Sequence, residues 1–498
     1  MLLNSENIAR KVSLASAIIL LGGIMLRLHV YLANRSLIID EANLARNVVE
    51  GNWLQFLQPL KYEQYAPPIF LCISKIAILC LGVNEFALRL LPLIAGIATL
   101  FFLWLMVKSL IRPVALQWYI LWMLAFSGAA VRYSTEFKQY SVDMAVVLGL
   151  ISWAWLSRDK AWTWSGSIIW SLAGASVIWI SMPTVFALAG IGIAFSGRSF
   201  RHEKSQLLKT LIPIICWLSS FALYFYLILS ADIRSDYLQQ FHAPYFIDLL
   251  PGSIPQLQKS IEILLGVFRA MVDKSAVSLV FAIASVCFGS IYLLRKQRFL
   301  ACLLIIPIGL CLLASHLHLF SLLERVVLFT VPLLLLLMGI GLTRMIRFQP
   351  KWTIPIVTLV ALFTIYNQKG LSYFSTRMEF EDSKSAMRYM AGQKQIGEPI
   401  FVPADAVPAF VFYNEMYAKA WHLKPFYLAA WDKLPSAVMP YLFDVKPTPR
   451  NGWIFFSHTF PDTKAATLVD IKQIGTVNLS FETAYSSSVF RFEPIKPF

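Results

Sequence analysis

Runs of about 20 apolar residues recur along this chain of 498 residues and limit its fold more than any other feature. A run of that length spans the hydrocarbon of a bilayer as an α-helix, because a helix satisfies its own backbone hydrogen bonds. Apolar residues make up 58% of the chain and charged residues 14%, whereas soluble domains carry roughly 25% charged residues. We therefore expect a polytopic α-helical membrane protein.

The apolar pattern predicts about 11 to 13 transmembrane helices. The first run follows Arg10 and Lys11 and is too long for the apolar part of a signal peptide, so we expect it to be retained. Segment 68–82 is short and contains Lys75, and we place it at the membrane interface. The eleven predicted spans cover residues 12–33, 88–108, 114–131, 141–157, 164–180, 184–197, 207–230, 276–294, 299–315, 326–343 and 352–367.

The net charge of +15 is explained by membrane topology better than by nucleic-acid binding. If segment 68–82 does not cross, the connections rich in Lys and Arg fall on one side, which the positive-inside rule makes cytoplasmic. The loop with Asp40, the cluster around Glu136, the 231–275 loop and the C-terminal region then share the opposite side. We expect no nucleic-acid partner.

Residues 368–498 differ in pattern from the apolar part. Strand-like pieces occur at 399–402, 453–457 and 489–492, and a helical pattern occurs at 383–392. We expect a small α/β domain at 368–498 that follows a membrane domain at 1–367, whose first outer loop, 34–87, holds interfacial helices. Prolines interrupt the apolar runs of this region at Pro399, Pro403, Pro408, Pro425, Pro435, Pro440, Pro447, Pro449 and Pro461.

Two acidic clusters border the predicted spans. Asp40 and Glu41 open a helical pattern, where they either cap that helix or provide a base for an acceptor hydroxyl or amine. Glu136, Lys138 and Asp143 are either a structural ion-pair network or a site in which Lys138 binds phosphate and Glu136 supports a sugar. If this segment is a helix, Glu136 stacks on Tyr140 and Gln139 stacks on Asp143, because residues four apart lie on the same face.

Other candidate residues carry weaker signals. Arg27, in the first span, either reaches toward the interface or holds an anionic headgroup. Arg325, at the start of another span, is either an anchor or a phosphate ligand. Glu63 and His242 are the two candidate metal ligands, and two ligands do not make a metal motif. A divalent metal therefore stays open, and no other cofactor is indicated.

The order and spacing of several motifs resemble those of the GT-C membrane glycosyltransferases. The resemblance is to the family 39 type, which includes protein O-mannosyltransferases and the lipid A aminoarabinose transferase, and it covers about residues 12–345. The matching motifs are Asp40-Glu41, Pro67-Pro68, Glu85 to Pro92, Tyr133 to Asp143, and Arg325 followed by Pro332.

This resemblance implies a set of roles. Asp40 matches the family's catalytic carboxylate and Glu136 its second acidic position, while Arg325 would face the lipid phosphate. Glu63 matches an outer-loop glutamate that, in some relatives, joins a histidine at a metal site. The sequence departs from this pattern at Asn43, where some relatives carry a phosphate-contacting Arg, and at Gln64, where the aminoarabinose transferases carry Lys. Both departures argue against aminoarabinose transfer.

The resulting hypothesis is an inverting glycosyltransferase that uses a polyprenyl-phosphate-linked sugar on the extracytoplasmic side of the membrane. The acceptor is a lipid, a glycan or a protein, and the location is a bacterial plasma (inner) membrane with the C-terminus outside. The alternatives are a transporter or flippase of lipid-linked saccharides and an O-antigen-type ligase or polymerase. The predicted site residues are Asp40, Glu41 and Glu136 for catalysis, Arg27, Lys138 and Arg325 for the donor phosphate, and Tyr133, Gln139, Tyr140 and Asp143 for the substrate.

Overall fold

The computed structural model of this protein describes residues 2–160, 162–202, 206–272, 275–429 and 451–494. Pro435, Pro440, Pro447 and Pro449 lie outside the described residues, as do the side chains of Arg10 and Lys11. The chain forms two compact units, each of which draws on three separate stretches. Unit 1 is Met1–Leu32, Trp53–Ser74 and Arg89–Thr376, and unit 2 is Ala33–Asn52, Lys75–Leu88 and Arg377–Phe498.

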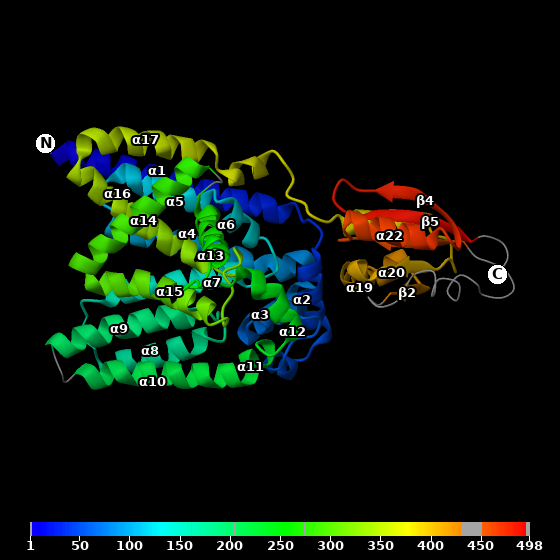
Figure 1. Ribbon diagram of the computed structural model, residues 1–498, viewed down its shortest axis with the longest axis horizontal. Coiled ribbons are helices and arrows are strands. Elements are labelled where there is room, and N and C mark those ends of the chain that lie inside the picture. The colour runs from blue at the N-terminus through cyan, green and yellow to red at the C-terminus, as the bar shows by residue number, and fades with distance from the viewer. Residues whose placement is uncertain (1, 161, 203–205, 273–274, 430–450, 495–498) are drawn as a thin grey trace. The chain divides into compact units, whose positions relative to one another are not determined.

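All the regular secondary structure in the described residues of unit 1 is helical (Figure 1). Helices α3 (Pro68–Leu81) and α4 (Glu85–Leu110) have residues in both units. The other helices of unit 1 are α1 (Leu2–Leu32), η1 (Trp53–Leu57), α5 (Val114–Ala125), α6 (Gly128–Tyr133), α7 (Tyr140–Ser157), α8 (Trp164–Val177), α9 (Thr184–His202), α10 (Leu207–Tyr224), η3 (Phe225–Leu229), α11 (Ser230–Asp232), α12 (Asp236–His242), η4 (Ala243–Tyr245), α13 (Ile254–Met271), α14 (Ala276–Lys296), α15 (Arg298–His316), η5 (Leu328–Thr330), α16 (Val331–Phe348), α17 (Pro350–Tyr366) and η6 (Lys369–Phe374).

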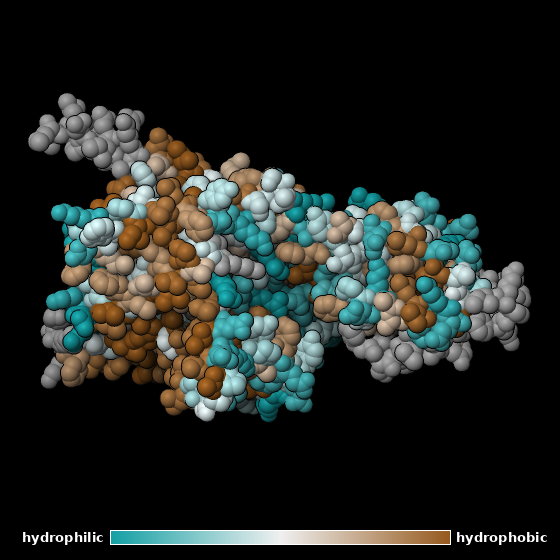
Figure 2. All heavy atoms as spheres, turned by 45° about the horizontal axis from the view of Figure 1, so that its top comes forward, coloured by the Kyte–Doolittle hydropathy of each residue, from teal (hydrophilic) through white to brown (hydrophobic). Residues whose placement is uncertain are grey.

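Each of the eleven predicted spans overlaps at least one helix, which confirms a polytopic α-helical membrane protein. Among the described residues, eight helices are long and apolar enough to cross a bilayer, and apolar side chains dominate the surface of the bundle in Figure 2. The predicted spans at α5, α8 and α9 have shorter apolar helices. The eight are Leu14–Leu32, Glu85–Leu110, Tyr140–Ser157, Leu207–Leu229, Ala276–Lys296, Arg298–His316, Leu328–Phe348 and Pro350–Phe374.

The span predicted at 114–131 is two helices, α5 and α6, with a break at Phe126. Arg27 donates to the carbonyls of Ala125 at 2.8 Å and Leu124 at 3.2 Å. Gln368 donates to the carbonyl of Met123 at 3.0 Å. Carbonyls at the end of a helix have no partner within it, so these donors let α5 end inside an apolar segment.

Helices α14 and α16 pack backbone against backbone through two glycines. A Cβ added at Gly341 would lie 1.9 Å from the carbonyl oxygen of Ser285, and one added at Gly289 would lie 2.1 Å from that of Leu337. No side chain fits at such separations. Small residues at helix interfaces allow this close approach, which membrane helices use because burial of apolar surface does not drive their association.

Unit 2 holds a sheet of five strands in the order β2-β1-β3-β5-β4. Strands β2 (Phe426–Leu428), β1 (Ile400–Val402) and β3 (Gly452–Phe456) are parallel, whereas β5 (Ser488–Pro494) pairs antiparallel with both β3 and β4 (Gly475–Glu482). The predicted α/β character is confirmed: the strand-like pieces match β1, β3 and β5, and the helical pattern matches α18 (Ser383–Gln393). The other helices of unit 2 are α2 (Ile39–Glu50), η7 (Ala404–Ala406), α19 (Val407–Met416), α20 (Ala418–Trp421) and α22 (Pro461–Ile471).

Unit 2 also contains α2, which the sequence analysis placed in the membrane domain. Helix α2 packs against α19 of the C-terminal region. Its last carbonyls, those of Val48 and Val49, accept hydrogen bonds from Lys75 Nζ at 2.8 and 3.0 Å. Lys75, which interrupts the apolar run at 68–82, therefore caps the C-terminal end of α2.

We predict that Gly341→Val lowers the melting temperature of the full chain in detergent. The added side chain must push α16 away from α14, and overpacking of this kind costs about 1–3 kcal/mol or more. Gly309→Val is the matched control, since a Cβ at Gly309 on α15 meets nothing within 4 Å. Equal melting temperatures for the two variants would contradict the close packing of α14 and α16.

Candidate functional site

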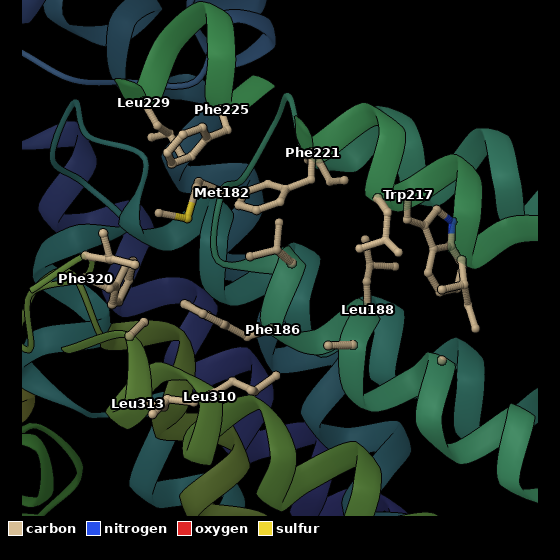
Figure 3. Close-up of a pocket in the computed structure, with 18 of the residues that line it drawn as sticks. Met182, Phe186, Leu188, Trp217, Phe221, Phe225, Leu229, Leu310, Leu313 and Phe320 are labelled. Carbon is tan, nitrogen blue, oxygen red and sulfur yellow. The ribbon is translucent and has the colours of Figure 1, made fainter. Parts of the chain in front are cut away.

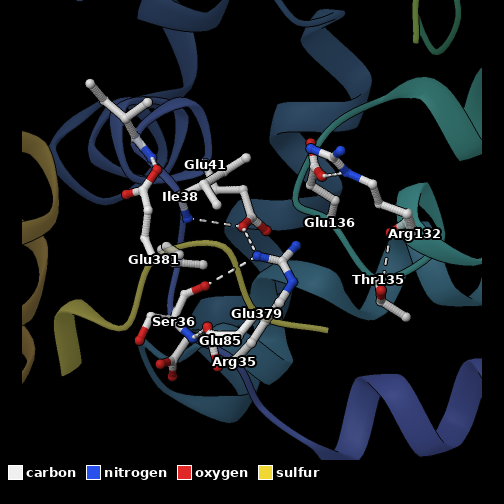
Figure 4. Close-up of polar contacts among 12 residues, drawn as sticks. Arg35, Ser36, Ile38, Glu41, Glu85, Arg132, Thr135, Glu136, Glu379 and Glu381 are labelled. Carbon is white, nitrogen blue, oxygen red and sulfur yellow. Dashed lines mark hydrogen bonds and ion pairs between the residues drawn. The ribbon is translucent and has the colours of Figure 1, made fainter. Parts of the chain in front are cut away.

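The predicted catalytic pair, Asp40 and Glu41, lies in the first turn of α2 in unit 2. Glu41 is fully buried, and its carboxylate accepts from the Ile38 N–H at 3.2 Å and from Arg35 Nη1 at 2.7 Å (Figure 4). Asp40 is partly exposed. The two adjacent carboxylates thus have different environments. Glu41 stabilises the turn before α2, whereas Asp40 is accessible at the surface.

The backbone amides that precede Asp40 are bound by side chains from the C-terminal region, all within unit 2. Ser36 N–H donates to Glu379 at 3.1 Å, Leu37 N–H to the Tyr413 hydroxyl at 2.8 Å, and Ile39 N–H to Glu381 at 3.3 Å. Amides in front of a helix have no intrahelical partner, so these three acceptors fix where α2 begins. None of these three acceptors was predicted from the sequence, although the acidic run Glu379-Phe-Glu381-Asp382 is a readable signal for two of them.

A second ion pair ties the beginning of α4 to the same region. Lys384 Nζ on α18 lies 2.7 Å from Glu85 and donates to the Asn34 carbonyl at 2.9 Å. The Tyr413 hydroxyl donates to Glu85 at 3.2 Å. Glu85, which belongs to one of the family-like motifs, therefore helps to hold the segment before α2.

Glu379 is a buried carboxyl with an altered ionisation. Burial raises its pKa to about 7; Arg377 and Arg35 oppose this rise, and Asp382 adds to it. The folded chain therefore binds a proton at Glu379 more tightly than an ordinary glutamate does.

The Glu136 cluster lies in unit 1, between α6 and α7. The prediction of one helix across Glu136 and Tyr140 is wrong, because residues 134–139 form turns and bends and α7 begins only at Tyr140. Glu136 is fully buried and accepts from Arg132 Nε at 3.0 Å (Figure 4). The bent backbone directs its carboxylate back to Arg132 instead of over Tyr140.

The other residues of this cluster are also buried. Lys138 Nζ donates to Gln64 Oε1 at 2.6 Å, so Gln64 serves as a neutral partner of this ammonium group. The rings of Tyr133 and Tyr140 meet edge to face with centroids 5.3 Å apart. Gln139 and Asp143 are buried at the beginning of α7, where the Asp143 N–H donates to the Gln139 carbonyl at 2.9 Å.

Arg325 lies within electrostatic reach of this cluster. Burial raises the pKa of the Tyr133 phenol and Glu136 raises it further, while Arg132 and Arg325 lower it. The Arg325 guanidinium also lies over the Phe241 ring, 5.8 Å from its centroid. Unit 1 therefore brings Tyr133, Glu136 and Arg325 together. Arg27 has a different environment, because three backbone carbonyls accept from its guanidinium.

Unit 1 also contains an apolar cavity of about 590 Å³. Phe186 and Leu188 on α9, Trp217 and Phe221 on α10 and Leu310 on α15 point into it (Figure 3). The lining is almost entirely hydrocarbon, so the cavity suits an apolar chain and offers nothing to a charged headgroup.

Comparison with solved structures identifies the architecture. ArnT from Cupriavidus metallidurans in the apo state aligns with a TM-score of 0.53 and 11% identity over 97% of this chain and 98% of that chain. The same enzyme bound to undecaprenyl phosphate also aligns with a TM-score of 0.53 and 11% identity, over 96% and 97%. An oligosaccharyltransferase from Archaeoglobus fulgidus gives a TM-score of 0.45 and 12% identity over 80% of this chain and 61% of that chain.

The chain has the GT-C fold. At 11% identity, the likeness to ArnT extends to architecture and to nothing finer. No protein-family model matches the sequence, and no curated protein matches it.

The two candidate metal ligands, Glu63 and His242, are associated with opposite ends of α12. Glu63 accepts from the hydroxyl of Ser235, which caps the beginning of α12, whereas His242 ends α12. Burial lowers the pKa of His242, and Arg325 lowers it further, which places a cation beside this ring. The described residues contain no cluster of three or more His, Cys, Asp or Glu side chains that could hold a metal.

We predict that the melting temperature of the protein falls as pH rises from 4.5 to 7, and that Glu379→Gln makes this fall less steep. The folded state holds the Glu379 proton more tightly than the unfolded state, so its stabilising effect is complete below the ordinary pKa and is lost as pH rises to about 7. Gln retains the acceptor for Ser36 but cannot titrate. Glu493→Gln, at an exposed position of β5, is the control. Parallel curves for Glu379→Gln and wild type would refute the assignment.

Proposed function

We propose that this protein transfers a sugar from a polyprenyl-phosphate-linked donor to an acceptor on the extracytoplasmic side of the membrane, with inversion at the anomeric carbon. The observation that carries this proposal is the alignment with ArnT along nearly the whole of both chains. The ArnT structure that holds undecaprenyl phosphate suggests the donor class. The acceptor is a lipid, a glycan or a protein, and the proposed location is a bacterial inner membrane with the C-terminal region outside.

The donor half of the reaction is assigned to unit 1. An isoprenoid chain is hydrocarbon and suits the apolar cavity between α9, α10 and α15. Its phosphate needs cations, and Lys138 and Arg325 supply one buried ammonium and one partly buried guanidinium. We leave Arg27 out of this set, although the sequence suggested it, because backbone carbonyls already accept from both of its terminal nitrogens.

The acceptor half is assigned to Asp40. As the acceptor oxygen or nitrogen attacks the anomeric carbon, its proton passes to the Asp40 carboxylate. The bond between that carbon and the phosphate oxygen breaks, and the prenyl phosphate leaves with the electron pair. Attack from the face opposite the leaving group inverts the centre. Cations at the phosphate supply most of the catalysis, since the leaving group develops charge and needs no proton.

Two other predicted catalytic residues take supporting roles. Glu41, bound by Arg35 and the Ile38 amide, positions the turn that presents Asp40. Glu136 is paired with Arg132 and lies near Tyr133. We assign sugar binding to the cluster Tyr133, Gln139, Tyr140 and Asp143, and Glu136 orders one side of it.

We predict that Asp40→Asn abolishes transfer while leaving the melting temperature unchanged. The assay incubates purified protein with radiolabelled polyprenyl-phosphate sugars and follows the release of prenyl phosphate. Loss of a general base lowers rates by about 10²–10⁴-fold. Turnover like that of wild type would rule out Asp40 as the base. Movement of donor across liposome membranes, with no release by any variant, would indicate a flippase instead.

We predict that Arg325→Ala weakens donor binding by tenfold or more, because a charge-assisted contact to phosphate contributes roughly 1.5–3 kcal/mol. The measurement is the apparent KM for the donor. Arg269→Ala removes an exposed arginine from the end of α13 and should leave KM unchanged. An unaltered KM in Arg325→Ala would exclude the phosphate role.

A further inference from the structure

One carboxylate oxygen of unit 2 joins α2 to a histidine of the C-terminal region. Glu381 Oε1 accepts from the Ile39 N–H at 3.3 Å and lies 2.6 Å from His458 Nδ1. Ile39 immediately precedes Asp40 in the chain, and His458 follows β3. The imidazole is thus held at the first turn of α2 by the same oxygen that binds the amide beside Asp40.

The position of His458 is tightly constrained. Its backbone is left-handed, with φ of 61°, a conformation that non-glycine residues hold only when their surroundings impose it. Glu381 is buried, whereas 38% of the His458 side chain is exposed. One ring nitrogen therefore faces a buried carboxylate while the ring as a whole remains open to solvent.

Three carboxylates act on this imidazole from three different segments. Glu381 contacts the ring, and Asp405 on η7 and Asp40 on α2 act on it electrostatically. Together they raise the pKa of His458, chiefly through the hydrogen bond with Glu381, although burial lowers it. A protonated His458 ring is a cation among carboxylates, and its charge acts on Asp40 and Asp405.

We propose that His458, held by Glu381, is a positioning residue that keeps Asp40 ionised and so available as the general base. This inference rests on the proposed function, because it concerns the carboxylate that takes the acceptor's proton. The histidine itself forms and breaks no bond in the reaction. It lowers the pH at which Asp40 becomes a carboxylate, so the C-terminal region sets the working pH of the enzyme.

The test is the pH profile of kcat for the full chain in detergent, measured with a polyprenyl-phosphate sugar from pH 5 to 8. An opposite charge within about 4–6 Å shifts a carboxyl pKa by roughly one to three units. His458→Gln should therefore move the acid limb at least one unit toward higher pH, which is about a tenfold loss of kcat on that limb. At pH 8, where Asp40 is ionised in either case, kcat should be close to that of wild type.

Two matched variants separate charge from structure. His458→Arg restores a permanent cation and should return the acid limb to the wild-type position. His422→Gln replaces another left-handed histidine of unit 2, with φ of 46°, and should leave the profile unchanged. Each kcat is divided by the value of the same variant at pH 8, so a smaller folded fraction cancels.

Each result supports or overturns the inference. A shifted limb in His458→Gln that His458→Arg corrects supports it. An unshifted limb in His458→Gln overturns it, as does an equal shift in His422→Gln or a failure of His458→Arg to correct the profile. Asp40→Asn is measured in parallel. If that variant still transfers sugar, the proposed function itself fails. If Asp40→Asn is inactive and the acid limb of His458→Gln is unshifted, only the role of His458 is refuted.

Discussion

A helix that ends within an apolar segment leaves carbonyls that water cannot reach, and the contacts at the end of α5 in unit 1 satisfy this need. Helix α5 has only 12 residues. Its last carbonyls accept from Arg27 of α1 and from Gln368, which lies beyond α17. Two segments that are far apart in the chain are thereby fixed to one helix end. An arginine that looks like a ligand for an anionic lipid is, in this fold, the cap of α5.

The same requirement governs the approach to Asp40 in unit 2. Amides before α2 need acceptors, and Glu379, Tyr413 and Glu381 provide them from the C-terminal region. Because amides and acceptors are more than 340 residues apart in sequence, the position of Asp40 is a property of the completed unit. The proposed base is therefore held by a small α/β sheet domain as firmly as by its own helix.

Hydropathy located the helices because it is a local property of the chain, and it identified a membrane protein without ambiguity. It did not reveal the break at Phe126, since the partners of that helix end lie about 100 and 245 residues away. Short strand-like runs identified β1, β3 and β5, which are mostly buried. They did not identify β4, which carries many exposed residues, or β2, whose three residues are only partly buried. Of the candidate site, the sequence found the acidic residues that border the spans. It could not assign a role to Glu381 or His458, because that role depends on the contacts of Glu381 with Ile39 and with His458, which only folding creates.

The division of unit 2 into three stretches has a consequence for biosynthesis. Residues 33–52 leave the ribosome when the acceptors for their amides, at 377–498, have yet to be translated. A chain made at about 5–20 residues per second spends tens of seconds in this state. During that interval the amides before α2 and the buried pair of Arg35 and Glu41 lack the surroundings that enclose them in the finished protein. The segment that bears Asp40 thus matures only when synthesis ends, so a chain that is released early carries the proposed base but lacks the partners that hold it in place.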